Sequence, residues 1–344
     1  MINSDAQCLK NDTLDGHSYR DTWARYIATW LKDVDAHGVP IWGLTPQNEV
    51  EARQTLFESC AYSVDDYVNF VGEFLGPALL AANLSTHVLA YDHNKMDSYK
   101  YVYGIENDMK ARNVVDYYAI HWYDYTDSLG LDRLDSIHSL APNKPIINTE
   151  ACFLESLTYD WENTGFLYAV DIIGDLTHWV SGWLNWNTVL LAGDRFPESY
   201  GGPNHDNTTH FGDGILFEFN ASGTQRLIYQ SSYWIQGHFS RFMRPGSVVV
   251  QTTGQSTATT YEDFEAIRNH SVQCANSPCA PVSLKLLSVG FVDEERGHAG
   301  VVVANANAFL MNFNIYDQQL NQFTACSIPP FSIQSYDFLL DKKS

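Results

Sequence analysis

Two glutamates that follow short apolar runs are the residues of this sequence best suited to acid–base chemistry. Glu49 comes after the run Trp42-Gly-Leu-Thr-Pro and directly after Asn48, and Glu150 closes the run "IINTE". Hydrolysis of a glycosidic bond uses one carboxylic acid to protonate the leaving oxygen and one carboxylate beside the anomeric carbon. A single glutamate after a strand more often caps a helix or lies on the surface, so the pair is the informative feature.

Aromatic and amide side chains close two further apolar runs. These are His121, Trp122 and Tyr123 in "AIHWY", and Asn185, Trp186 and Asn187 in "GWLNWN". Aromatic rings can stack on the apolar face of a sugar, and amides can bind its hydroxyl groups. Sugar chemistry is therefore the hypothesis for the set, while a packed histidine and a space-filling tryptophan are equally good interpretations of His121 and Trp122.

Apolar runs that alternate with helical patterns must position these residues. Ser18-x-x-Asp21 and Ser63-x-x-Asp66 are typical of helix starts. Five short runs predict strands, at residues 40–46, 87–91, 117–123, 145–151 and 182–187. Strands that alternate with helices predict parallel βαβ units. In a barrel built from such units the carboxyl ends of the strands meet at one rim, so Glu49 and Glu150 would meet there.

The pattern of the sequence changes after Pro245-Gly246. Residues 226–243 predict a helix, and the later runs, such as "SVVVQTT" and "GVVVANAN", predict strands separated by turns. A chain of 344 residues is long enough for two cores. We therefore predict an α/β barrel region over residues 1–244 and an antiparallel β-sandwich over residues 245–344.

Composition excludes several classes of function. The chain has 41 acidic against 20 basic side chains and a formal charge of −21, which disfavours nucleic-acid binding. It has no apolar run of a length that would cross a membrane. Its histidines, cysteines and acidic residues have no metal-ligand spacing, so we expect no metal and no cofactor.

Cysteines and glycosylation motifs favour the secretory pathway. Cys274 and Cys279, in "CANSPC", could form a disulfide bond. Acceptor motifs for N-glycosylation occur at Asn11, Asn83, Asn207, Asn220 and Asn269. The first residues, "MINSDAQCLKNDT", do not have the pattern of a signal peptide.

Several motifs together resemble one enzyme family. "WGLTPQNE", "HWY", "NTEAC", "GWLNWN" with the later "GGPN", and "GHFSRFMRPGS" resemble the lysosomal type of glucosylceramidase in glycoside hydrolase family 30. The resemblance keeps the same order from about residue 9 to 340. It implies a (β/α)8 TIM-type barrel with an attached antiparallel β-sandwich. The first strands of that barrel have no counterpart here, so the barrel is expected to be N-terminally incomplete.

The resemblance also implies roles for individual residues. Glu49 matches the acid/base and Glu150 the nucleophile of a double displacement that retains configuration. Asn48 matches an asparagine that binds the sugar 2-hydroxyl. The remaining matches are expected beside the substrate, at His121, Trp122, Tyr123, Trp186 and Asn187.

The substrate implied by the resemblance is glucosylceramide, cleaved to glucose and ceramide. The resemblance also implies that the protein acts on a glycosphingolipid at a membrane surface, has an activator protein as a partner, and is lysosomal or secreted. Two alternatives stay open at this point. One keeps the glutamate pair but acts as a β-xylosidase or an endo-β-1,6-glucanase, and the other is a catalytically inactive remnant that binds glycan or lipid.

Overall fold

The computed structural model describes most of the chain. The described residues are 9, 13–14, 16–53, 59–123, 129–152, 165–186, 188–192, 215–219, 225–252, 286–317 and 321–340. They form two compact units, one of residues 1–151 with 178–184 and one of residues 152–177 with 185–344. Each unit is described by itself. The sequence boundary near residue 245 is a different division of the chain and stays a prediction.

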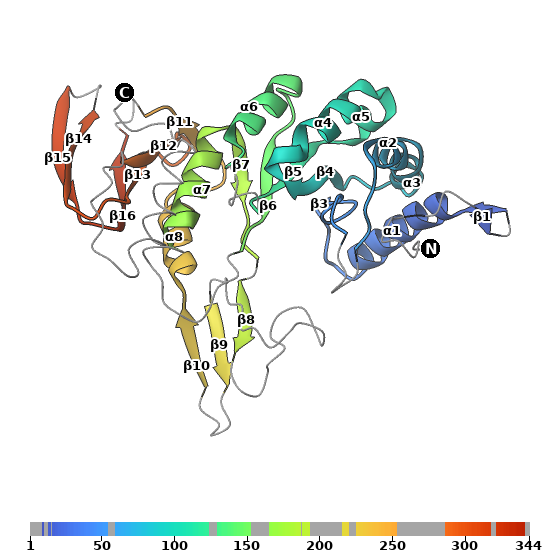
Figure 1. The fold of residues 1–344 in the computed structure, drawn as a ribbon, viewed down its shortest axis with the longest axis horizontal. Helices are drawn as coiled ribbons and strands as arrows, with labels where there is room; N and C mark the ends of the chain where they lie inside the picture. Colours follow the sequence, from blue (N-terminus) through green and yellow to red (C-terminus); the bar gives the residue numbers. More distant parts are fainter. Residues whose placement is uncertain are drawn as a thin grey trace. The chain divides into compact units, whose positions relative to one another are not determined.

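The first unit is built on a five-stranded parallel sheet (Figure 1). Its strands, in spatial and sequence order, are β3 (Gly43–Leu44), β4 (His87–Asn94), β5 (Tyr117–His121), β6 (Ile146–Glu150) and β7 (Val180–Trp183). Each of the five apolar runs contributes one strand, which confirms the predicted order. Since all five strands run in the same direction, their carboxyl ends lie along a single edge of the sheet.

Strands β4 and β5, in the interior of the sheet, are buried because both faces of a parallel sheet are covered. The buried part of β4 is Val88–Asp92, and that of β5 is Tyr118–His121. Each of these segments ends in a charged or titratable side chain, Asp92 or His121. A buried polar group is costly without a partner, so the ends of β4 and β5 must be held in a hydrogen-bonded network.

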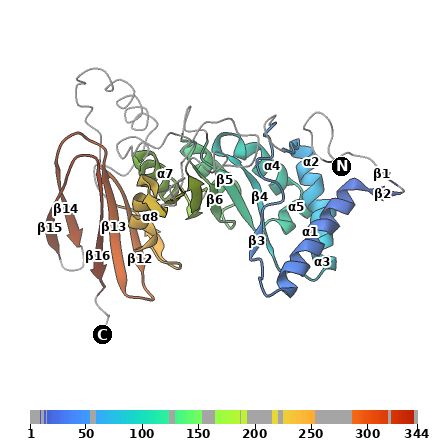
Figure 2. The ribbon, with the colours of Figure 1, turned by 90° about the horizontal axis from the view of Figure 1, so that it is seen from below.

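Helices connect the strands of this unit and lie beside the sheet (Figure 2). They are α1 (Tyr19–Ala36), α2 (Val64–Asn69), the π-helix η1 (Phe70–Leu75), α3 (Gly76–Ala81), the 3-10 turn η2 (Lys95–Asp97), α4 (Ser98–Asn107), α5 (Met109–Val114) and α6 (Leu131–Leu140). A short hairpin of β1 (Thr13–Leu14) and β2 (His17–Ser18) precedes α1. Ser18 and Ser63 are the N-caps of α1 and α2, as predicted. The hydroxyl of Ser63 accepts from the backbone N–H of Asp66 at 3.2 Å, which satisfies one free amide of the first turn.

A group of buried tyrosines supports the end of β4. The hydroxyl of Tyr67 accepts a hydrogen bond from the backbone N–H of Tyr91 at 3.1 Å, and the rings of Tyr91 and Tyr101 have centroids 5.1 Å apart. At this point the pairing of β4 with β5 shifts register between Tyr91 and His93, and both Tyr91 and Asp92 have positive φ, 85° and 60°. Such a β-bulge changes the direction of the side chains that follow it.

The described residues of the second unit form three antiparallel or mixed sheets and two helices. Its elements are α7 (Phe166–Thr177), β8 (Val189–Ala192), β9 (Ile215–Phe219), β10 (Gln225–Tyr229), α8 (Ser231–Ser240), β11 (Val248–Val250), β12 (Leu287–Asp293), β13 (His298–Asn305), β14 (Met311–Asp317), β15 (Gln322–Ile328) and β16 (Ser332–Leu339). The order β11-β12-β13-β16 is antiparallel throughout, and β14 and β15 form a hairpin. Leu286, Val303 and Ile328 form an apolar core that links this sheet to the hairpin. The strand-rich C-terminal region is therefore confirmed.

One element of the second unit corrects the sequence analysis. The helix predicted over residues 226–243 begins only at Ser231, because residues Gln225–Tyr229 form the strand β10. β10 pairs along its whole length with β9, so the hydrogen bonds of a neighbouring strand decide its conformation. Among the described helices, none combines the length and the apolar character that a membrane crossing requires.

Candidate active site

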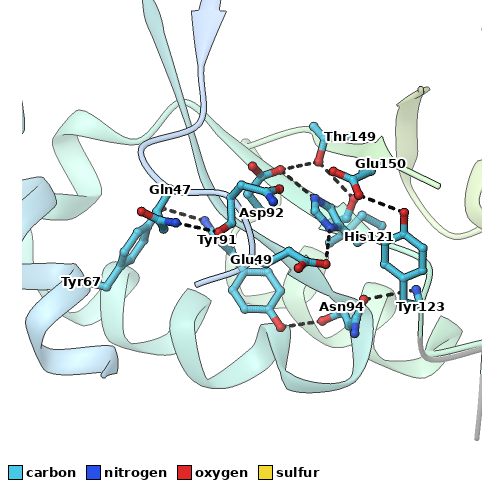
Figure 3. A network of polar contacts seen from close by, with 12 residues as sticks. Gln47, Glu49, Tyr67, Tyr91, Asp92, Asn94, His121, Tyr123, Thr149 and Glu150 are labelled. Carbon is cyan, nitrogen blue, oxygen red and sulfur yellow. Dashed lines mark hydrogen bonds and ion pairs between the residues drawn. The ribbon is translucent and has the colours of Figure 1, made fainter. Parts of the chain in front are cut away.

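Glu49 lies just past the end of β3 and is fixed through its backbone. Its N–H donates to the backbone carbonyl of Asp92 at 2.8 Å, and its φ is 50°. A positive φ is unfavourable for a residue with a side chain, so the surrounding contacts must maintain it. The Glu49 side chain is only 17% exposed. The turn after β3 therefore holds the carboxylate against the end of β4 (Figure 3).

Asp92 is the buried anchor of the site. Its Oδ1 accepts hydrogen bonds from the Thr149 hydroxyl at 2.6 Å and from His121 Nε2 at 3.1 Å. Burial raises the pKa of Asp92, but the hydrogen bond and positive charge of His121, with the hydroxyls of Thr149 and Thr45, bring the pKa below its usual value. Asp92 is therefore ionised, and it joins the ends of β4, β5 and β6.

His121 carries positive charge in the middle of the site. Its Nε2 faces Asp92, and its Nδ1 lies 3.7 Å from Glu49 Oε1. Burial would lower the pKa of His121, but the hydrogen bond to Asp92 and the nearby carboxylates of Glu49, Asp92 and Glu150 raise the pKa to about 9. The imidazole ring is thus a cation at neutral pH, with a proton on each nitrogen.

Glu150 ends β6 beside the same histidine. β6 pairs with β5 so that Glu150 lies opposite His121, and Glu150 Oε1 accepts from the hydroxyl of Tyr123 at 2.9 Å. Burial raises the pKa of Glu150, and the negative charges of Glu49 and Asp92 raise it further. The charge of His121 and the hydrogen bond from Tyr123 oppose this rise in pKa.

The arrangement joins two glutamates around one cation. Figure 3 shows Glu49 directed toward His121, and Glu150 directed toward Tyr123 on the other side of that histidine. Glycosidic cleavage needs one carboxyl group that gives a proton and a second that stays a carboxylate, so this pair of glutamates is suited to that chemistry.

The other residues named by the sequence analysis have different positions. Asn48 is exposed beside Glu49, and its backbone carbonyl accepts from the side-chain amide of Gln47 at 2.8 Å. Trp122 is 2% exposed and packs edge-on against Trp183, so its contacts are those of a core residue. Trp186 is exposed in the second unit, and Asn187 lies outside the described residues.

Sequence analysis missed four residues of this network. Asp92, His93 and Asn94 follow the apolar run "HVLAY", and Thr149 precedes Glu150. Asn94 Oδ1 accepts from the backbone N–H of Tyr123 at 3.2 Å, and so holds the segment that carries the Tyr123 ring. The sequence could have predicted the first three, because the polar run "DHN" follows an apolar run in the same way as the polar residues that end the other predicted strands.

His93 adds a second imidazole to the site. One ligand atom each from Glu49, His93 and His121 lie within 4.8 Å of one another. Burial lowers the pKa of His93. The negative charge of Glu49 opposes this shift, whereas the positive charge of His121 lowers the pKa further. Two imidazoles and a carboxylate at this spacing are a ligand set that divalent transition metals bind.

Comparison with known proteins agrees with this fold. Residues 6–243 match the family described as "Glycosyl hydrolase family 30 TIM-barrel domain". A protein called putative glucosylceramidase 4, from Caenorhabditis elegans, is 29% identical over 248 residues, which are 67% of this chain and 44% of that protein. The lysosomal acid glucosylceramidase of Mus musculus is 27% identical over 241 residues, again 67% and 44% of the two chains.

Relatives with another named activity match equally well. Endo-1,6-beta-D-glucanase BGN16.3 of Trichoderma harzianum is 28% identical over 247 residues, covering 71% of this chain and 46% of that protein. Among solved structures, SrfJ from Salmonella typhimurium superposes with a TM-score of 0.75 at 22% identity, over 94% of this chain and 63% of that one. The fold class is therefore confirmed. The chain spans less than half the length of these curated relatives.

Proposed function

The chain belongs to glycosyl hydrolase family 30, and on that premise we propose that it is a retaining β-glucosidase that cleaves glucosylceramide to glucose and ceramide. One observation carries the proposal. Glu49 and Glu150 come from the ends of separate strands to a buried histidine cation, and Tyr123 donates a hydrogen bond to Glu150. The family match and the glutamate pair support the same reaction class.

In the first step, protonated Glu49 gives its proton to the glycosidic oxygen while the carboxylate of Glu150 attacks the anomeric carbon. The bond from that carbon to the leaving oxygen breaks, ceramide leaves as an alcohol, and glucose becomes an ester of Glu150. The positive charge of His121 and the Tyr123 hydroxyl both favour the ionised form of Glu150, which is the form that attacks.

In the second step the roles of the carboxyl groups change. Glu49, now ionised, takes a proton from water, and the resulting hydroxide attacks the anomeric carbon from the face that the ceramide left. The ester bond to Glu150 breaks, glucose departs with its original configuration, and Glu49 is protonated again for the next cycle. No metal ion takes part in either step.

The substrate is proposed from the relatives. Five of the curated matches bear the name glucosylceramidase; four of these are called putative, and the fifth is the lysosomal acid enzyme. Asn48, His121, Tyr123, Trp186 and Asn187 are proposed to bind the sugar, as the sequence motifs imply, whereas buried Trp122 packs against Trp183. The proposed setting is a glycosphingolipid at a membrane surface, in the lysosome or outside the cell, with an activator protein as a partner.

A second candidate is an endo-β-1,6-glucanase with the same two glutamates. The observation that favours it is the Trichoderma glucanase, which covers slightly more of this chain at nearly the same identity. The two candidates differ in what occupies the leaving-group side of the site, a lipid or another glucose. Release of glucose from glucosylceramide vesicles, compared with release of oligosaccharides from a β-1,6-glucan, separates them.

Labelling of the nucleophile tests the reaction class itself. A 2-deoxy-2-fluoroglucoside with a dinitrophenolate leaving group enters the first step, but the fluorine slows the second, so the glucosyl ester accumulates. We expect one adduct per chain, located on Glu150 by peptide mass spectrometry. The Glu150→Gln variant, confirmed as folded by circular dichroism, should acquire none. An unlabelled wild-type chain that is folded would instead support the non-catalytic, glycan- or lipid-binding alternative.

A further inference from the structure

His93 has no part in the proposed reaction, yet it is oriented into the same cluster. It lies in β4 directly after Asp92, and the register shift at this point allows two consecutive residues of one strand to contribute to the same site. In a regular strand, neighbouring side chains point to opposite faces of the sheet. The bulge thus brings a second imidazole to Glu49 and His121, with ligand atoms within 4.8 Å of one another.

The Nδ1 atom of each histidine in this cluster lacks a hydrogen bond. Nδ1 of His121 is buried and has no hydrogen-bond partner, since Glu49 Oε1 at 3.7 Å is beyond hydrogen-bond distance. The His121 side chain is 1% exposed, so water cannot easily take the place of a partner. Nδ1 of His93 is also buried without a hydrogen bond. A buried nitrogen without a partner is costly, and its retention points to a ligand that it can bind.

The other side of the His121 ring already has the contact that metal sites use. Nε2 of His121 is hydrogen-bonded to the carboxylate of Asp92 at 3.1 Å, and Asp92 is in turn held by Thr149. In metal sites a ligating histidine commonly donates its second ring N–H to a carboxylate, which fixes the ring and makes the free nitrogen a better ligand. The pair of Asp92 and His121 has this arrangement, with Nδ1 directed to Glu49.

We propose that Glu49, His93 and His121 form a binding site for a divalent transition-metal ion, with Zn²⁺ as the first choice, and that the bound ion inhibits the enzyme. The ion displaces the proton on His121 Nδ1, which passes to solvent, and takes one oxygen of Glu49 and one nitrogen of each histidine. The fourth position is left for water. The binding stands on the cluster alone, whereas the inhibition rests on the function proposed above for Glu49.

The ligand types select the ion. Imidazole nitrogen suits Zn²⁺, Cu²⁺ and Ni²⁺, whereas Mg²⁺ and Ca²⁺ prefer oxygen ligands, so the site should discriminate against the latter two. Zinc binds nitrogen and carboxylate oxygen at about 2.1 Å, which places neighbouring tetrahedral ligand atoms about 3.3 Å apart. His121 Nδ1 and Glu49 Oε1, at 3.7 Å, are close to that spacing. The ligand atom of His93 lies within 4.8 Å of those of Glu49 and His121.

Inhibition follows from what Glu49 must do. A carboxylate that binds zinc cannot carry the proton that the leaving oxygen needs, so the first chemical step stops. Removal of the ion by a chelator restores the proton donor. The ion is therefore a reversible inhibitor that competes with a proton at the acid/base.

Calorimetric titration of Zn²⁺ into the full chain, first stripped with a chelator, tests the binding. We expect one ion per chain and no binding of Mg²⁺ under the same conditions. His93→Gln should weaken zinc binding by at least about tenfold, since even outer contacts of a metal site have effects of 10–100-fold. His37→Gln, which changes an exposed histidine outside the cluster, should bind zinc as the wild type does. Thermal melting checks that both variants are folded.

Visible absorption of Co²⁺ in the same site gives a second readout that needs no activity. The d–d bands expected for imidazole coordination should appear with the wild type and be lost in the His93→Gln variant. Equal zinc affinity in the wild type and in His93→Gln, or a wild type that binds no zinc, would overturn the site. A third variant, Glu49→Gln, should bind zinc more weakly as well, because the amide is a poor ligand.

Measurements of glucoside hydrolysis with and without zinc test the inhibitory role separately from the proposed function. Zinc should abolish glucoside hydrolysis by the wild type, the chelator should restore it, and the residual activity of His93→Gln should tolerate at least about ten times more zinc. Zinc that binds at one equivalent without loss of activity would overturn the inhibitory role. A chain inactive before zinc is added counts against the proposed function, and the two binding measurements then decide the site.

Discussion

The backbone amide of Glu49 donates a hydrogen bond to the backbone carbonyl of Asp92 over 2.8 Å. The side chain of the same Asp92 accepts from His121, and His121 Nδ1 lies 3.7 Å from the Glu49 carboxylate. The three residues thus form a closed ring, in which the position of the candidate acid depends on a residue that does not itself contact the substrate. The ring gives each of the following experiments a specific structural target.

Replacement of Asp92 by Asn should lower kcat. The amide keeps the shape and the backbone hydrogen bond to Glu49 but removes the charge that stabilises the His121 cation, so the pKa of His121 should fall. We expect a loss of kcat on the order of 100-fold with a smaller change in KM, as for a misplaced catalytic group. The fall in the pKa of His121, followed by NMR of the imidazole, distinguishes this positioning role from general damage. Asp97→Asn, at an exposed position paired with Lys100, is the control, and an unchanged kcat in Asp92→Asn would contradict the ring.

Replacement of Glu49 by Gln should depend on the leaving group. The loss of a general acid costs about 10²–10⁴-fold on a substrate with an alkoxide leaving group. A dinitrophenyl glucoside needs no proton, so the first step on that substrate should be nearly normal. Added azide should then restore turnover and give the β-glucosyl azide, identified by NMR. Equal losses on both substrates would exclude Glu49 as the acid.

The hydroxyl of Tyr123 should set the low-pH limit of activity. Its hydrogen bond to Glu150 Oε1 favours the ionised carboxylate, so Tyr123→Phe should raise the pKa of Glu150 further. Because the nucleophile must be ionised, the acid limb of kcat/KM against pH should move to higher pH. A hydrogen bond of about 1 kcal/mol corresponds to a shift of somewhat less than one pH unit. Tyr103→Phe, an exposed tyrosine on α4, should leave the profile where it is.

Folding stability should decrease in alkaline solution because of His121. The folded-state pKa of about 9 is above the ordinary value of 6.5, so the contribution of the cation is complete below about pH 6.5 and is lost as the pH rises through 9. The free energy of unfolding, from urea titrations, should fall over this range by no more than about 3 kcal/mol. In His121→Asn this part of the pH dependence should disappear. Asp92 acts in the opposite range, since its lowered pKa gives stability that is lost only at low pH.

The tyrosine support of the bulge can be tested by Tyr67→Phe. The change removes the hydroxyl that accepts from the Tyr91 amide at 3.1 Å, and Tyr67 is fully buried. We expect the free energy of unfolding to fall by about 1–3 kcal/mol. Activity should fall as well, because Asp92 and His93 follow directly. Tyr99→Phe, which is partly exposed on α4, provides the comparison, and a stable but inactive Tyr67→Phe would assign the residue to the site alone.

The parallel sheet could be predicted because its strands are apolar runs that are separated by capped helices. β4 and β5 carry long buried segments that only a sheet covered on both faces accommodates. The strand β10 could not be predicted, since "RLIYQ" fits a helix and its pairing with β9 is a contact between separate segments. Local sequence does not contain that information.

For the site, the sequence analysis found the strand ends but not the bulge. Glu49, His121, Tyr123 and Glu150 were expected to meet, and they lie in one network. Asp92 and His93 were overlooked because the strand was predicted to end at residue 91, whereas β4 continues to Asn94. The register shift between Tyr91 and His93 interrupts the alternation of side chains along β4, and a single sequence does not predict such a shift. Trp122 was open between two interpretations, and its edge contact with Trp183 supports packing.

The backbone at position 49 carries an evolutionary cost. With φ at 50°, this is a backbone conformation that glycine or asparagine adopts more easily, so folding stability alone does not favour glutamate there. Neutral drift in a lineage that had lost the activity would relax this residue early. Whether related genes keep glutamate at position 49 would therefore indicate whether their products remain catalytic.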